Sequence, residues 1–116
     1  MKSILSICLI LIGLLLICLT GCAMIPGGVA PSNTPINGRS YTELGYAKET
    51  DSRFYLLGLI PVSGSNTTRD AIQEAIDSKN GDALINITVE TYGQYWILWS
   101  RVATRVEGNV IRFYQN

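Results

Sequence analysis

Three kinds of hydrophobic pattern divide this chain. Residues 4–19 are almost uninterruptedly apolar, whereas residues 22–40 show no periodicity and are rich in Gly, Pro and Asn. From residue 41 to the end, short apolar runs alternate with polar turn residues, which is typical of a folded domain. We therefore divide the chain into residues 1–21, 22–40 and 41–116.

The last part carries several strand patterns and one helix pattern. Residues 82–91 alternate, with Ala83, Ile85, Ile87 and Val89 on one side, as a half-buried strand does. Residues 54–62 are nearly all apolar but too few for an amphipathic helix. Polar stretches at 50–53, 92–94 and 107–109 predict turns. The expected strands are 41–49, 54–62, 82–91, 95–106 and 110–114.

Residues 67–80 predict the helix. Thr67 followed by Asp70 fits a capping pattern for the free N–H groups of the first turn. Asn80-Gly81 supplies a left-handed residue where the helix ends. The apolar residues recur at helical spacing and form one stripe: Ala71, Ile72, Ala75 and Ile76. The resulting order ββαβββ predicts an α+β fold, with an antiparallel sheet of about five strands and one helix packed on one face.

The amino-terminal segment has the layout of a secretory signal peptide, with Lys2 before the apolar run and small residues after it. It ends in Leu19-Thr20-Gly21-Cys22, which resembles the lipobox of bacterial lipoproteins. This resemblance implies that residues 1–21 are removed and that Cys22 receives a diacylglyceryl group and an N-acyl chain such as palmitate.

Two or three acyl chains would give a stable membrane anchor, because each buried methylene contributes about 0.8 kcal/mol. By the lipoprotein sorting rule, Ala23 after the cysteine favours the outer membrane, facing the periplasm. The alternative is an uncleaved transmembrane anchor, for which residues 3–19 lie at the lower end of the roughly 17–25 residues needed. Residues 22–40 predict a flexible tether with a reach of about 25 Å.

Composition limits the possible chemistry. The chain has no histidine, and of its three cysteines two lie in the signal segment while Cys22 is reserved for lipid. Lys2 is the only charged residue before Cys22, so the mature part has eight Lys+Arg against nine Asp+Glu. This near-neutral balance gives no general attraction to nucleic acid. We expect no metal, no disulfide and no cofactor beyond the covalent lipid.

Two weaker patterns are each explained by a solvated protein surface. Arg101, Arg105 and Arg112 near the aromatic residues 95–99 superficially resemble a nucleic-acid platform, but they are expected to lie over the sheet and pair with Glu90 or Glu107. The acidic residues of the helix are expected to be solvated, so we predict no enzyme. A deep pocket that joins two acidic residues would reverse this: Asp70, Glu74, Asp82 or Glu90.

A further resemblance is carried by Ala71-Ile72-Gln73-Glu74-Ala75 leading to Gly81-Asp82-Ala83-Leu84-Ile85-Asn86-Ile87. An Ala-rich helix that runs into such a strand resembles small bacterial lipoproteins of unknown function, among them the TRL-like (tRNA-associated-locus-like) group. The resemblance covers about residues 58–89. It implies the same fold and brings no catalytic residues.

The most informative feature is that residues 95–99 and 54–60 are apolar on both strand faces. One helix covers only one face, so the second face would be an exposed apolar patch, typical of an interface. We expect this face to bind a second copy or another envelope protein. The alternatives are a curled sheet or folded-back tether that covers it, or a ligand site for peptidoglycan or a small apolar molecule. The predicted interface residues are Tyr95, Ile97, Trp99, Tyr55, Leu57 and Leu59.

Overall fold

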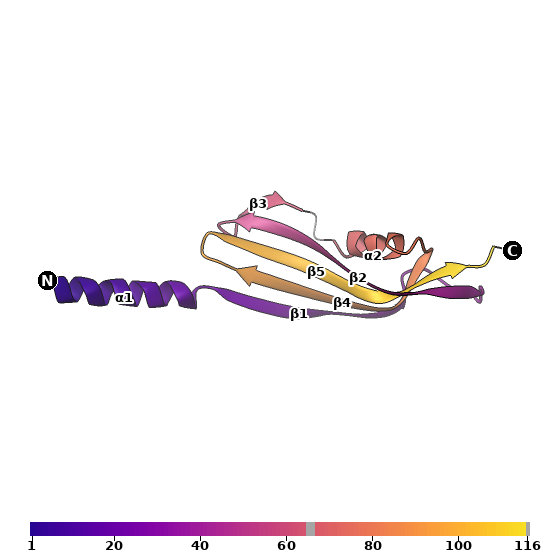
Figure 1. Ribbon diagram of the computed structural model, residues 1–116, viewed down its shortest axis with the longest axis horizontal. Coiled ribbons are helices and arrows are strands. Elements are labelled where there is room, and N and C mark those ends of the chain that lie inside the picture. Colours follow the sequence, from indigo (N-terminus) through magenta and orange to yellow (C-terminus); the bar gives the residue numbers. More distant parts are fainter. Residues whose placement is uncertain (65–66, 116) are drawn as a thin grey trace.

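The computed structural model describes residues 1–64 and 67–115, and it confirms the α+β class. A five-stranded antiparallel sheet carries one helix on one face, and a second helix projects beyond one end of the sheet (Figure 1). The elements are α1 (Lys2–Cys18), β1 (Gly21–Ser32), β2 (Tyr41–Leu56), β3 (Ile60–Ser63), α2 (Thr68–Asp77), β4 (Ala83–Tyr95) and β5 (Trp99–Phe113).

The strands lie in the order β1-β4-β5-β2-β3, and every neighbouring pair is antiparallel. Two strands, β4 and β5, form a long central hairpin, with β2 on the other side of β5. After α1 the elements follow as βββαββ, so the expected order ββαβββ is wrong in detail although the class is right. The edge strands are the 12-residue β1, which falls in the predicted tether, and the four-residue β3, most of which falls in the predicted strand 54–62.

The predicted flexible tether is wrong for residues 22–32. These residues form most of β1 and pair with β4 from Gly21↔Tyr95 to Ser32↔Ile85. Prolines are accepted here because an edge strand has only one neighbour and leaves alternate N–H groups facing solvent. The register shifts between Pro26 and Gly28, where Gly28 has φ 112°, so the edge is also bulged.

All three predicted turns are also wrong, because β2, β4 and β5 run straight through 50–53, 92–94 and 107–109, respectively. Gly108 serves close packing rather than a turn: a Cβ there would lie 2.8 Å from the Ile85 carbonyl oxygen. The chain instead reverses at 57–59, where Leu57 and Gly58 have φ 52° and 69°, and at 96–98. Consecutive positive φ values match the twist of the flanking strands in a tight hairpin.

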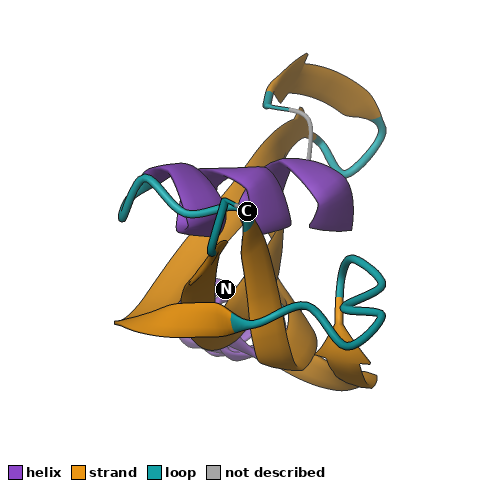
Figure 2. Ribbon diagram, turned by 90° about the vertical axis from the view of Figure 1, so that its right-hand side faces the viewer, coloured by secondary structure: helices purple, strands orange, loops and turns teal. Residues whose placement is uncertain are grey.

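Helix α2 lies across one face of the sheet and closes the main core (Figure 2). The predicted cap is confirmed, because the Thr67 hydroxyl accepts a hydrogen bond from the Asp70 N–H at 3.1 Å. The helix also stops as predicted, with Asn80 at φ 53°. The buried residues of this core are Ala47, Ala71, Ala75, Ile76, Leu84, Ile87, Val106 and Val110.

The alternation of residues 82–91 is interrupted by a bulge at Asn86, which has φ 52°. Ala83 and Ile85 therefore pack with Ile111 in a second cluster, while Ile87 belongs to the core under α2. The prediction that these alternate residues share one face is wrong, since one extra residue in a strand reverses the sides of all that follow.

Helix α1 has no buried residue and packs against no other element extensively. It leaves the sheet at the end where β2 and β4 terminate, away from α2 (Figure 1). Within the described residues, no helix has both the length and the apolarity required for a membrane span.

Candidate functional site

The two hairpin reversals form one exposed apolar surface at the end of the sheet. They lie side by side, and the Leu57 N–H donates a hydrogen bond of 2.8 Å to the Leu98 carbonyl. No charged residue occurs in 54–64 or in 91–100. We call this surface the apolar tip, and it consists of Leu56, Leu57, Leu59, Ile60, Trp96, Ile97, Leu98 and Trp99.

All eight residues of the apolar tip are exposed, from 38% for Trp96 to 65% for Leu98 and 84% for Leu59. Isolated exposed apolar residues are normal on soluble proteins. A contiguous group from two hydrogen-bonded hairpins is different, and patches of this kind mark contact sites.

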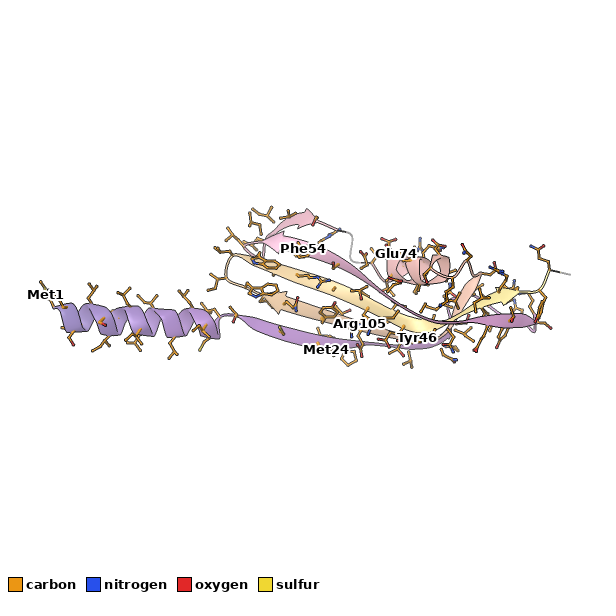
Figure 3. All side chains as sticks on the ribbon, viewed as in Figure 1. Met1, Met24, Tyr46, Phe54, Glu74 and Arg105 are labelled. Atoms are coloured by element: carbon orange, nitrogen blue, oxygen red, sulfur yellow. The ribbon has the colours of Figure 1, made fainter. Side chains whose placement is uncertain are left out.

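The tryptophans of the apolar tip are ordered by stacking. The Trp96 and Trp99 rings are 4.1 Å apart at 16°, and Trp99 stacks on Phe54 at 5.9 Å and 28°. The Arg101 guanidinium lies 5.7 Å from the Phe54 ring centre and 5.8 Å from that of Tyr92. Figure 3 shows Phe54 near this end of the sheet, far from Glu74 on α2. The rings of Trp96, Trp99 and Phe54 therefore pack on one another in one continuous stack.

The structure places all six predicted interface residues at this end, but they do not share a sheet face. Tyr55 and Tyr95 both pair with Ser100, so these two residues lie on one side of the sheet. Trp99 is adjacent to Ser100 in β5 and faces the opposite side. The prediction of one common face is wrong, because residues 96–98 form a turn rather than a strand.

Four residues of the apolar tip were missed: Leu56, Ile60, Trp96 and Leu98. A signal for them was present in the sequence. The two runs that lack charge, 54–64 and 91–100, each centre on one of the reversals. If each run is interpreted as the turn of a hairpin instead of as a strand, the residues of the apolar tip are predicted together.

Cys22 lies close behind the apolar tip, at an exposed position near the start of β1. It pairs with Gln94, which pairs with Arg101, which pairs with Phe54, which pairs with Ser63. One row across all five strands thus contains the predicted lipidation residue. We call this row, made of Cys22, Gln94, Arg101, Phe54 and Ser63, the Cys22 row.

The other residues of the predicted lipobox form the link between α1 and β1. Leu19 follows the helix, the Thr20 hydroxyl donates to the Ile17 carbonyl at 2.9 Å, and Gly21 begins the strand. A shallow pocket at this junction is lined by Leu16 and Thr20 together with residues 96–99. The predicted cleavage segment, residues 19–22, is therefore exposed beside the apolar tip.

Behind the Cys22 row, the face opposite α2 is polar. Arg105 pairs with Glu90 at 3.6 Å, as expected from the sequence, and Lys48 pairs with Glu107 at 3.3 Å. A hydrogen bond from the Tyr46 hydroxyl, assisted by Lys48, holds the pKa of Glu107 below its usual range. The same bond to Glu107 raises the pKa of Tyr46. These pairs are exposed and screened, so each adds little stability.

The acidic residues considered for catalysis are separated by the sheet. Glu90 pairs with Arg105 on the face opposite α2, whereas Asp70 and Glu74 belong to the helix itself. The Asp82 carboxylate accepts a hydrogen bond of 2.9 Å from the Phe113 N–H. In the part of the chain that the structure describes, no three His, Cys, Asp or Glu side chains are grouped to hold a metal ion.

Comparison with protein-family models, with curated proteins and with solved structures finds no match to this chain. The resemblance to TRL-like lipoproteins stays a prediction. The functional proposals below depend on the arrangement of α1, Cys22 and the apolar tip.

Proposed function

We propose that this chain is the precursor of a bacterial envelope lipoprotein, anchored by lipid on Cys22 and acting as a non-enzymatic interaction module. Its contact surface is the apolar tip. The observation that carries the proposal is the exposed position of Cys22 in a row directly behind that tip.

The behaviour of α1 supports its role as a removable signal peptide. None of its residues is buried, and neither core cluster includes any residue before Ala30. Cleavage before Cys22 would therefore leave the folded domain and nearly all of β1 intact. A helix required for folding would instead contribute apolar side chains to a core.

The chemistry of the apolar tip supports contact rather than catalysis. General acid–base catalysis needs ionisable groups within hydrogen-bond reach of a substrate, and the two runs that form the tip contain no charged residue. Apolar and aromatic side chains of this kind bury surface against a partner.

The mass of the mature protein from bacterial membranes tests the anchor. We expect a chain that begins at Cys22 and carries a diacylglyceryl group with or without an N-acyl chain. Cys22→Ser should accumulate as the unprocessed precursor, while Cys18→Ser, in the apolar run, should be processed normally. An unmodified chain that retains Met1 would contradict the proposal.

A further inference from the structure

We propose that the apolar tip inserts into the same membrane leaflet that holds the acyl chains of Cys22, so that the sheet stands on the bilayer at two adjoining contacts. This inference rests on the proposed lipidation of Cys22 and names the partner of the apolar tip. The partner is the phospholipid bilayer itself.

The apolar tip extends past Cys22 along the sheet. On the tip side of the Cys22 row, Ile97 lies three residues from Gln94, Leu98 lies three from Arg101, and Leu57 lies three from Phe54. At about 3.3 Å per residue, both reversals extend roughly 10 Å past the level of Cys22. Interfacial segments bury their apolar face about 5–10 Å into the boundary between headgroups and acyl chains. Acyl chains that leave Cys22 would thus place the apolar tip at that depth.

Cys22 is joined to the sheet directly, without a flexible tether. Cys22 already belongs to β1, and its neighbours Ala23 and Met24 continue the pairing with β4. A flexible linker would allow the domain to stand away from the headgroups, but a hydrogen-bonded strand does not. The lipid is therefore fixed beside the apolar tip, and any bilayer that holds the lipid also meets the tip.

Behind the apolar tip, basic residues come first and acidic residues lie further back. Counted from the tip, the first charged residue of β5 is Arg101, in the Cys22 row, and the first of β2 is Arg53, one position further back. The nearest acidic residues, Asp51 and Glu90, lie three and four positions behind that row. Cationic groups therefore sit at the level of the phosphates, where long side chains reach the headgroups from an apolar surface.

The residue types of the apolar tip also fit a membrane interface. Tryptophan is enriched where membranes meet water, and the chain places its two tryptophans, Trp96 and Trp99, in the apolar tip. Leu57, Ile97 and Leu98 lie at the extreme end, with no polar group to keep in water. A second copy or a glycan would have to occupy this same end in competition with the lipid that Cys22 carries.

The test uses the two native tryptophans as depth probes. The mature lipidated protein is reconstituted in phosphatidylethanolamine and phosphatidylglycerol vesicles, with phospholipids brominated at shallow or deep acyl positions. We expect shallow bromines to reduce the emission about twofold or more, consistent with insertion near the acyl boundary. Deep bromines should quench less, and acrylamide from the aqueous side should quench weakly.

Two variants make the result specific. Ile97→Ser combined with Leu98→Ser keeps both tryptophans and should reduce bromolipid quenching while increasing acrylamide quenching. Val29→Ser removes an apolar side chain that is 83% exposed on β1, away from the apolar tip, and should leave both unchanged. Unfolding midpoints of all three proteins show whether either variant alters the fold.

Each alternative outcome identifies what has failed. If mass spectrometry shows lipid on Cys22 but no bromolipid quenches the tryptophans, the insertion is overturned while the proposed anchor stands. Crosslinking to a second copy through the tip, or protection of the tryptophans by peptidoglycan fragments alone, would likewise overturn it. If Cys22 carries no lipid, the proposed function itself fails, and insertion fails with it.

Discussion

Both ends of the sheet carry large apolar side chains, but these side chains differ in exposure. At the end under α2, Leu84, Val106 and Val110 are fully buried. At the other end, Leu57 and Leu98 remain 59% and 65% exposed. The strands β2, β4 and β5 run through both ends, so the difference does not arise from separate domains.

The two ends differ in whether another element of the chain covers the apolar side chains of the sheet. One end is closed by α2, whose buried residues Ala71, Ala75 and Ile76 pack in the core. The other end has no covering element among the described residues and instead places its apolar side chains beside the exposed Cys22. Burial of apolar area is the main favourable term in folding and in association, so the covered end stabilises the fold and the open end is available to the membrane.

The largest predicted loss of stability comes from a substitution in the core under α2. Leu84→Ala removes a fully buried side chain from the core under α2 and should lower the free energy of unfolding by about 3 kcal/mol. The same change at Leu98 in the apolar tip should cost less than about 0.5 kcal/mol. Urea unfolding of the detergent-solubilised mature protein measures both. Equal losses would show that the tip is part of the folding core.

A second pair of changes tests close packing at the two ends. A Cβ at Gly108 would lie 2.8 Å from the Ile85 carbonyl oxygen and 2.9 Å from Leu84, so Gly108→Ala should cost about 1–3 kcal/mol. At Gly93, near the apolar tip, a Cβ would meet only the Tyr95 ring, at 3.2 Å. That exposed ring can move, so Gly93→Ala should be nearly neutral in thermal unfolding. A larger loss of thermal stability from Gly93→Ala than from Gly108→Ala would contradict the inference that packing is tighter at Gly108.

A smaller effect is expected at the start of α2, the element that covers the core. Thr67→Ala removes the acceptor for the Asp70 N–H and should lower stability by about 1 kcal/mol. Thr68→Ala, one residue further on and without a capping bond to this N–H, is the matched control and should change stability little. Tryptophan quenching by bromolipids should stay the same in both, since α2 lies away from the apolar tip.

The smallest predicted effect concerns pH. The pKa of Glu107 is lowered chiefly by the Tyr46 hydrogen bond, so its ionised form favours the folded state. This contribution is present above the unfolded pKa of about 4.3 and is lost as the pH falls through the lower folded value. Tyr46→Phe should raise the pKa of Glu107 toward its ordinary range in an NMR titration of the carboxyl carbon. Tyr41→Phe should not, and equal values in both variants would refute the assignment.

The fold class could be predicted from the sequence because its signals are local. The cap at Thr67, the apolar stripe of α2 and the stop at Asn80 each depend on a few neighbouring residues. Register and bulges depend on the partner strand, so the reversal of sides at Asn86 has no clear signal in its own segment. Strand β1 was missed for the same reason, since its prolines are acceptable only because the strand lies at an edge.

The candidate site was predicted in part. All six proposed residues lie at the apolar end. They could be predicted because the sequence has more apolar strand residues than one helix can cover. Their arrangement was not predictable from alternation, since Leu57 and Gly58 turn with positive φ in the middle of an apolar run. If this run is treated as one extended strand, its apolar side chains are expected on a sheet face, whereas the structure places them at the apolar tip.

Photo-crosslinking in living cells tests most directly whether the two ends face different environments. A photoreactive residue replaces Ile97 in the apolar tip or, in a separate strain, Glu74 on the exposed side of α2, in the lipidated protein. Phospholipid adducts should form from position 97 and not from position 74. Adducts from position 97 to a second copy or another protein, with none to phospholipid, would contradict membrane insertion of the tip.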